Sequence, residues 1–432
     1  MSNNNDDWLA DFNLLNAFVP EPDPPASQQL GGDSPKNDVS QERDPFLEPP
    51  KEDSKKKKKN KDSKEETSTR KKKKKSKPLE EMSVMAIEDN KEMATKLKQL
   101  DDFSNYILDK EIEGLKKEYK TEIATIIPKP DEIKAFLQSQ NSRKNRNFTA
   151  PIYDHSRVIL KDQTSTEDSY VNASYITTLD GKKRYICAQS PLDNTVCDFW
   201  KMVFQENVEI IVMLCDFMEA KRKKSSEYIP LKVRSSICFQ DMAIYLVKRE
   251  VMAKDKNVVV NHLSITKGKK ELLIKHMLWK NWPDVGCPSV SSTAMYIYAA
   301  IYKSKYPILV HCASGIRRSP IFILISMFMD CVNETKVEND ILLKLAKHVR
   351  KQRAGAITSE IDYIYVSRVL LQRFLDRKLI HPSQKMLEFF DDYDPALKKA
   401  QKSEAEKKTE MTLGPMPVLP TNEKGEIIMP KK

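Results

Sequence analysis

The sequence lacks the features of secreted, membrane-spanning and metal-binding proteins. Residues 1–11 are mostly polar and acidic, without the basic start and apolar run of a secretory signal. The longest apolar stretch, Pro320–Met329, is about half as long as a bilayer requires. The 7 cysteines show no paired spacing and do not group with histidines, so neither a disulfide framework nor a zinc site is indicated. We expect an intracellular protein, cytoplasmic, nuclear or both, with no metal or organic cofactor.

Both ends of the chain have little that could form a core. Residues 1–85 are rich in Asn, Asp, Pro, Ser and Gln, and then in lysine. Such a segment buries too little apolar surface to offset the entropy of ordering it, so we predict a disordered polybasic tail over 1–85. Lysine, glutamate and proline dominate the other end, where we predict a mostly disordered charged tail over 381–432. The folded domain then occupies 86–380, enough for one well-buried core.

Much of the formal net charge of +11 comes from two lysine runs, Lys55–Lys59 and Lys71–Lys75. Basic runs in a tail favour contact with the import machinery, an anionic membrane surface or nucleic acid. A solvated spacer without a partner is the alternative. The sequence leaves these possibilities open.

Between the tails, the hydrophobic pattern predicts a mixed α/β (α+β) fold. Apolar residues from Met93 to Ile107 recur at spacings of three and four, which indicates an amphipathic helix, and a second helical stretch follows over 108–123. Strand-like runs then appear at 185–188, 209–214, 242–247, 258–265, 272–279 and 306–311, and helical segments at 290–304, 320–330, 338–350 and 360–375. We predict a central, twisted, mixed sheet flanked by helices.

The segment Tyr306–Pro320, which reads Y-P-I-L-V-H-C-A-S-G-I-R-R-S-P, has the pattern of a phosphate-transfer site. A buried strand precedes Cys312, and Pro320 suits the first turn of a helix. A loop between strand and helix can turn its backbone N–H groups inward as an anion nest, helped by the helix N-terminus. A cysteine placed there becomes a nucleophilic thiolate, and the fork of Arg318 can hold two phosphoryl oxygens. By itself, a cysteine and an arginine at this spacing also occur by chance.

A second motif precedes it by about thirty residues, at Trp282-Pro283-Asp284-Val285-Gly286-Cys287-Pro288. Two prolines stiffen this loop and Gly286 offers a hinge. A carboxylic acid at Asp284 could protonate the leaving oxygen of a phosphate ester and then act as a base on water. Taken alone, the segment is equally compatible with a turn and a helix-capping aspartate.

With these motifs in order, the chain resembles a phosphotyrosine-specific, non-receptor-like protein-tyrosine phosphatase over most of the span 114–374. The matching stretches are Gly114-Leu115, Glu118-Tyr119, Lys144-Asn145-Arg146, 153–158 (Y-D-H-S-R-V), 170–175 (Y-V-N-A-S-Y), Ala188-Gln189, Pro191-Leu192, Asp198-Phe199-Trp200, Trp282-Pro283-Asp284 and His311-Cys312.

The resemblance implies a role for each matching residue. Cys312 would form a phosphocysteine, Asp284 would be the general acid, Ser319 would ease release of the thiolate and His311 would help to hold it. Glu219 would orient the arginine and Lys224 would contact the acid loop. Phosphate would bind to Arg318 and to the backbone N–H groups of the nest, Ala313, Ser314, Gly315, Ile316 and Arg317.

The sequence departs from the family at the positions that recognise substrate and position water. Asn147 stands where the family has a tyrosine that stacks on the substrate ring, and Thr149 replaces a residue that holds the substrate backbone. Thr358 and Asp362 stand where glutamines position the hydrolytic water. Arg317 stands where the family has a glycine. An arginine would be strained there if the position required positive φ, and its charge could favour acidic ligands.

These features leave three functions open. The first is hydrolysis of phosphotyrosine in proteins, with turnover weakened at the second step. The second is a pseudophosphatase that captures phosphoproteins through the nest. The third is a cysteine phosphatase for a non-tyrosine substrate such as a phosphoinositide or an RNA 5′ phosphate.

Overall fold

The structure is a computed structural model that describes residues 79–161 and 169–413. The chain divides into two units, Met1–Ile87 and Glu88–Lys432. Nearly all of the first unit, including both lysine runs, lies outside the described residues. The architecture below is that of the second unit, together with Leu79–Ile87, the first residues of the helix α2 (Leu79–Glu118) that continues into it.

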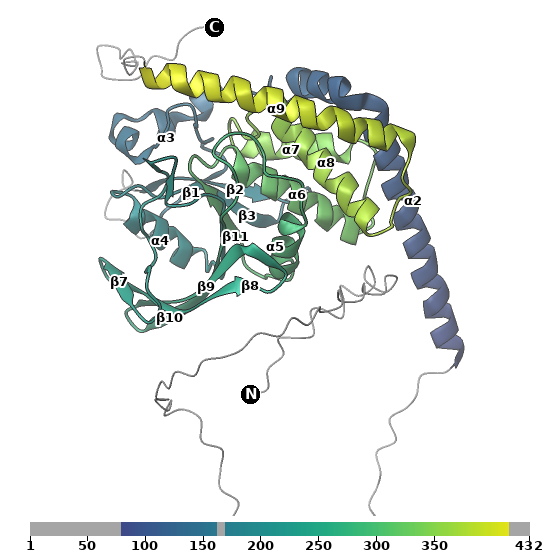
Figure 1. Ribbon diagram of the computed structural model, residues 1–432. Helices are drawn as coiled ribbons and strands as arrows, with labels where there is room; N and C mark the ends of the chain where they lie inside the picture. Colours follow the sequence, from purple (N-terminus) through teal and green to yellow (C-terminus); the bar gives the residue numbers. More distant parts are fainter. Residues whose placement is uncertain (1–78, 162–168, 414–432) are drawn as a thin grey trace, which may run out of the picture. The chain divides into compact units, whose positions relative to one another are not determined.

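The second unit is built on a nine-stranded mixed sheet of order β1-β2-β3-β11-β4-β10-β9-β8-β7 (Figure 1). β11 lies between β3 and β4 and is parallel to both, while the outer strands pair in antiparallel fashion. The bounds are β1 Arg157–Ile159, β2 Tyr170–Thr177, β3 Lys183–Gln189, β4 Ile210–Met213, β7 Ser236–Phe239, β8 Met242–Met252, β9 Asp255–Lys267, β10 Lys270–Trp279 and β11 Ile308–Cys312, with a separate hairpin of β5 Met218–Glu219 and β6 Arg222–Lys223. The predicted central mixed sheet is confirmed.

Helices cover both faces of this sheet. Their bounds are α2 Leu79–Glu118, α3 Lys134–Leu137, α4 Val196–Gln205, α5 Thr293–Ile301, α6 Arg318–Asn333, α7 Ile341–Gln352, α8 Glu360–Asp376 and α9 Gln384–Leu413, with a π-helical turn at Tyr119–Ile123 and 3-10 turns at Pro130–Glu132 and Ser139–Lys144. Each helical segment predicted from the hydrophobic pattern overlaps one of these elements. The predictions missed β1, β2, β5, β6, β7, α3, α4, α9 and the two 3-10 turns.

Alternating side chains of β11 join two separate cores. Ile308 and Val310 belong to the cluster that includes buried residues of α2, α5, α6, α7, α8 and α9, whereas Leu309 belongs to the cluster that includes α4. β11 is therefore buried on both faces, as expected for a central parallel strand, and reads as a continuous apolar run. Its carboxyl end, at Cys312, points to the edge of the sheet where ligands bind in open α/β sheets.

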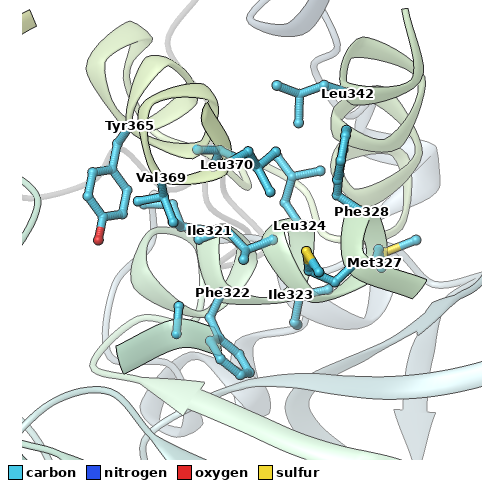
Figure 2. Packing of buried hydrophobic residues seen from close by; sticks show 14 of the residues in the cluster. Ile321, Phe322, Ile323, Leu324, Met327, Phe328, Leu342, Tyr365, Val369 and Leu370 are labelled. Atoms are coloured by element: carbon cyan, nitrogen blue, oxygen red, sulfur yellow. The ribbon is translucent and has the colours of Figure 1, made fainter. Parts of the chain in front are cut away.

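α6 is the helix that follows the nest, and its side chains form the centre of the larger core. Figure 2 shows Ile321, Leu324 and Phe328 of this helix lying toward Leu370 of α8 and Leu342 of α7; all five are fully or almost fully buried. Burial of this kind stabilises by roughly 1.5–3 kcal/mol per large apolar side chain. The N-terminus of α6 is thereby held in a fixed position relative to β11.

The C-terminal boundary of the folded part differs from the prediction. The sequence predicted a mostly disordered tail from residue 381, but α9 occupies Gln384–Leu413. Met386, Phe389 and Tyr393 are buried against the main core, and Arg368 lies over the ring of Phe390 at 3.4 Å. Sparse apolar residues at helical spacing are enough to dock this helix because the core supplies the partner surface. Residues 414–432 lie outside the described residues.

In the part of the chain that the structure describes, no helix is both long and apolar enough to cross a membrane. Nor do the described histidine, cysteine, aspartate and glutamate side chains include a group of three that could hold a metal ion.

Candidate active site

The nest is the turn between β11 and α6. β11 ends at Cys312, α6 begins at Arg318, and the residues between them are the predicted nest residues 313–317. Cys312 is almost fully buried. The strand, the turn and the helix therefore place the thiol and the arginine at one site, as predicted from their spacing.

Arginines from two other segments hold the carbonyl groups of this turn. Arg353 is fully buried and donates to the carbonyl oxygens of Ser314 and Gly315 at 3.1 and 3.0 Å. Arg146 donates from Nε to the carbonyl oxygen of Ala313 at 3.0 Å. In a trans peptide the N–H lies opposite the C=O, so carbonyls held outward leave the N–H groups facing the centre of the turn. This arrangement makes the turn an anion nest.

Gly315 is the one nest residue whose backbone requires glycine. Its φ is +69°, and a Cβ there would lie 2.5 Å from the backbone of Ala188 in β3. Arg317 instead has a φ of −114°, outside the left-handed region. The strain expected if Arg317 needed positive φ is therefore absent.

Arg318 is fixed by a bidentate ion pair. Its two terminal nitrogens donate to Glu219 at 2.6 and 2.9 Å, and they also donate to the carbonyl oxygens of Leu214 and Pro283 at 2.8 and 2.9 Å. Burial lowers the pKa of Arg318, but the bonds to Glu219 and the charge of Cys312 outweigh it, and the net pKa is raised. Glu219 therefore contacts the arginine as the resemblance implied, and the fork stays charged and oriented.

The acid loop lies over the nest, since Pro283 accepts a hydrogen bond from Arg318. Lys224 donates to Asp284 at 2.5 Å, and Arg318 lies 3.7 Å from the same carboxylate. Asp284, Lys224 and Arg318 thus meet at one place, although their segments are widely separated in the sequence. This geometry supports the roles expected for Asp284 and Lys224.

His311 begins a buried chain of hydrogen bonds. Its Nδ1 lies 2.8 Å from the hydroxyl of Ser190, and its Nε2 lies 2.6 Å from the hydroxyl of Tyr228, which also contacts His276 at 2.7 Å. Asn261 continues the chain, 3.1 Å from Nδ1 of His276. Burial lowers the pKa of His311 well below its usual value and that of His276 to about 3. Both rings are therefore neutral near pH 7 and fix the orientation of the backbone next to Cys312.

Ser319 is fully buried in the first turn of α6, and its hydroxyl has no hydrogen-bond partner among the described residues. A buried hydroxyl without a partner is unusual and needs an explanation, of which a catalytic role is one. The position next to Arg318 is compatible with the expected contact between this hydroxyl and the thiolate.

Two departures from the family pattern form a single ion pair. Arg317 donates from Nε to Asp362 at 3.1 Å, and the carboxylate of Asp362 also accepts from the hydroxyl of Thr358 at 2.8 Å. Asp362 is fully buried. On its other side Arg317 binds Glu404 of α9 at 2.5 Å. The expectation that the charge of Arg317 favours acidic ligands is wrong, because two carboxylates already neutralise it.

Asn147 lies on the exposed loop after the 3-10 turn Ser139–Lys144. Its side chain accepts a hydrogen bond from the backbone N–H of Thr149 at 2.9 Å, so it shapes its own loop. The neighbouring Phe148 is the exposed aromatic ring of this segment. An aromatic side chain is thus present one residue beyond the position where the family has its stacking ring.

The sequence interpretation missed the structural role of Arg353 and Arg146, which hold the nest. Arg146 was recognised only as part of the stretch Lys144-Asn145-Arg146, and no local pattern marks Arg353. One general rule could have found both: the outward carbonyl groups of a nest must be paired with buried hydrogen-bond donors.

Comparisons with known proteins agree with this geometry. The family model described as "Protein-tyrosine phosphatase" matches residues 141–372. The tyrosine phosphatase-like protein J1 of Microplitis demolitor bracovirus is 30% identical over 251 residues, which cover 55% of this chain and 82% of that protein. Human tyrosine-protein phosphatase non-receptor type 12 is 32% identical over 258 residues, covering 58% of this chain and 33% of that one.

Solved structures give the same assignment. The catalytic domain of human protein tyrosine phosphatase non-receptor type 18 has a TM-score of 0.55 and 25% identity, and the match covers 65% of this chain and 99% of that one. A second structure of the same phosphatase, which concerns distinct HER2 tyrosine phosphorylation sites, has a TM-score of 0.54. The chain belongs to the protein-tyrosine phosphatase family. The predicted family, the enzyme class and the fold are therefore confirmed.

Proposed function

We propose that the protein hydrolyses phosphotyrosine in proteins through a phosphocysteine intermediate, and that its second step is slow. The observation that carries the proposal is the convergence of three groups on one nest: Cys312 at its start, Arg318 held by Glu219, and Asp284 on a loop that rests on Arg318. Loss of any one of them would be expected in an inactive relative.

In the first step the thiolate of Cys312 attacks phosphorus and the bond between phosphorus and the tyrosyl oxygen breaks. Asp284 gives its proton to that oxygen, so that the phenol leaves neutral, a contribution of about 10²–10⁴-fold. The nest N–H groups and Arg318 stabilise the charge on the three peripheral oxygens. In the second step water attacks phosphorus, Asp284 takes a proton from the water, and the phosphorus–sulfur bond breaks to release phosphate and the thiolate.

The second step is the weaker one because of Thr358 and Asp362. Asp362 occupies the position of a water-positioning glutamine, but its two oxygens already bind Arg317 and Thr358. This pairing also supports the second candidate function, capture of phosphoproteins with little turnover. The third candidate, a non-tyrosine phosphate ester, loses one of the two features that suggested it, because the charge of Arg317 is neutralised; the basic tail is the other.

A rapid-quench assay on the full chain with an aryl phosphate tests the proposal. We expect a burst of phenol equal to the enzyme concentration and then slow steady turnover. Cys312→Ser should abolish both phases and Asp284→Ala should slow the burst, while Cys238→Ser, at an exposed cysteine of β7, should change neither. No burst and no turnover in the wild-type protein would refute hydrolysis and favour capture.

Restoring the family residues tests the account of the slow step. With 4-nitrophenyl phosphate, whose leaving group depends little on the acid loop, the triple variant Arg317→Gly, Thr358→Gln and Asp362→Gln should raise the steady rate by about tenfold and leave the burst rate within about threefold. A tenfold gain is a modest part of the roughly 10²–10⁴-fold that one positioned general-base step typically contributes. An unchanged steady rate in a folded triple variant would show that these positions do not limit hydrolysis.

For its environment, we propose that the protein acts inside the cell, in the cytoplasm, the nucleus or both, on phosphotyrosyl proteins. The lysine runs at 55–59 and 71–75 would direct it to the import machinery, an anionic membrane or nucleic acid. Replacing the lysines of both runs by glutamine should change the distribution of the fluorescently tagged full chain. An identical distribution would favour the spacer alternative.

A further inference from the structure

The last described turns of α9 lie against two loops of the active site. Glu404 accepts a hydrogen bond from the backbone N–H of Gly286 at 3.2 Å and one from Nη1 of Arg317 at 2.5 Å. Gln401, one turn earlier, packs so closely on Gly286 that a Cβ at this glycine would collide with its side chain. One carboxylate therefore joins the hinge of the acid loop to the rim of the nest.

A hydrogen bond at Gly286 is well placed to control the position of the acid loop. It follows Asp284 by two residues and has a φ of +77°, a conformation that other residues rarely adopt. The loop is closed in this structure, with Pro283 accepting from Arg318 at 2.9 Å. A hydrogen bond to the N–H of Gly286 therefore acts on the closed conformation and on the segment that carries the acid.

The other partner of Glu404 is itself held in place. Arg317 is tied to the buried carboxylate of Asp362, and Ser359, the N-cap of α8, accepts from the backbone N–H of Asp362 at 3.3 Å. The guanidinium thus binds Asp362 through Nε and Glu404 through Nη1, and the buried Asp362 fixes it relative to α8. Glu404 gains a fixed charged anchor at the nest.

The base of α9 is anchored separately from these contacts. Phe389 and Tyr393 are buried in the main core, and Phe390 stacks under Arg368. Ala396 and Ala400, between this anchor and Glu404, line a cavity of about 620 Å³ together with Thr358, Ser359 and Arg317. The helix therefore reaches the site from an anchor that does not depend on Glu404.

We propose that Glu404 is a positioning residue for the general acid, and that α9 is a working part of the active site. The inference rests on the proposed phosphatase function. Glu404 holds the hinge of the acid loop against the nest, so that Asp284 spends more of its time above the bound phosphate. A hydrogen bond to a charged group is strong enough to shift a loop equilibrium by about tenfold or more.

The test uses two esters that differ in their need for the acid. A 4-nitrophenolate leaves readily without a proton, whereas the phenolate of phenyl phosphate needs one, so the benefit of Asp284 is larger for phenyl phosphate. In the full chain, Glu404→Ala should lower the burst rate on phenyl phosphate by about 5–50-fold and that on 4-nitrophenyl phosphate by no more than about twofold. Glu404→Gln, which keeps an acceptor for Gly286 but loses the charge facing Arg317, should fall between.

Glu406 provides the matched control. It is an exposed glutamate on the same helix, two residues beyond Glu404. Glu406→Ala should leave both rates unchanged. A purely structural role for Glu404 would lower both rates equally, or lower the unfolding midpoint with no change in leaving-group dependence, and either result would overturn the proposal. An equal rise in both rates would also overturn it, because α9 would then block substrate access.

Tryptophan fluorescence separates this inference from the proposed function. Trp282 is the first residue of the acid loop, and it is buried with its ring 4.9 Å from that of Trp279. Glu404→Ala should increase acrylamide quenching of Trp282, measured as the difference from a Trp282→Phe protein, and Glu406→Ala should not. If the wild-type chain hydrolyses neither ester, the proposed function fails, and unchanged quenching would separately show that Glu404 does not hold the loop.

Discussion

The ion pair between Arg317 and Asp362 should behave as one coupled unit. The two side chains are 15% and 0% exposed and are joined at 3.1 Å. They stand 45 positions apart in the chain, on the nest and on α8. A double-mutant cycle with Arg317→Ala and Asp362→Ala therefore measures whether these two departures from the family pattern compensate each other.

The structure gives different costs for the two single variants. Arg317→Ala removes the guanidinium that pairs with the fully buried Asp362 and leaves its carboxylate two neutral side-chain donors, the hydroxyl of Thr358 at 2.8 Å and the thiol of Cys287 at 3.5 Å, so we expect a loss of about 3–5 kcal/mol in unfolding free energy. Asp362→Ala leaves Arg317 bound to Glu404, so we expect a smaller loss, about 2–4 kcal/mol. The double variant removes both charges and should lose about 2 kcal/mol less than the sum of the single losses.

Urea unfolding of the four proteins gives these free energies. The solvent-accessible pair of Lys344 with Asp340, the N-cap residue of α7, at 2.9 Å, is the control. Its cycle should show less than about 0.5 kcal/mol of coupling, because solvent screens the pair and Lys344 keeps Glu338 as a second partner. Additive losses at Arg317 and Asp362 would refute the reasoning: the two departures would then be independent substitutions that happen to lie near each other.

Three further predictions concern substrate recognition, pH and the nest. Asn147→Tyr should lower the KM for a phosphotyrosyl peptide by about 2–10-fold in steady-state assays, since a ring stack is worth about 0.5–1.5 kcal/mol, and an unchanged KM would show that the loop no longer faces the substrate. His276 and His311 stay neutral when folded but bind protons when unfolded below their usual pKa of 6.5, so stability is full above that pH and is lost as pH falls below it. Urea unfolding should show that the unfolding free energy of the wild type falls by about 3 kcal/mol between about pH 7.5 and about pH 5.5. The fall should be roughly halved in His276→Asn and retained in the exposed control His381→Asn. Equal falls in the wild type and both variants would contradict this. Gly315→Ala should abolish the phenol burst, because its φ of +69° and the neighbouring β3 backbone leave no room for a Cβ, and a normal burst would contradict the described nest.

The local chemistry of the nest was predictable from the sequence. A continuous apolar run before Cys312, a turn of fixed length, and an arginine and a proline at a helix start are all encoded within fifteen consecutive residues. Local preferences and chain connectivity are enough to place such groups, because the turn can close in only a few ways. The acid loop was predictable for the same reason, from Trp282 to Pro288.

Packing decided the roles of the residues that lie outside these motifs. Nothing in the sequence around Arg353 indicates that it holds the carbonyls of Ser314 and Gly315, since the contact joins the residue that follows α7 to a turn more than thirty positions earlier. The C-terminal boundary was wrong because the few apolar residues of α9 bury only against a core assembled from other helices.

The sequence by itself determined the family, the candidate nucleophile and the candidate acid, because these depend on motifs of adjacent residues. Only the tertiary structure decided that Arg317 faces Asp362, and that Glu404 lies between Arg317 and Gly286. Charges on distant segments can pair in many ways along a chain, and it is the close packing of α6, α8 and α9 that selects one of them.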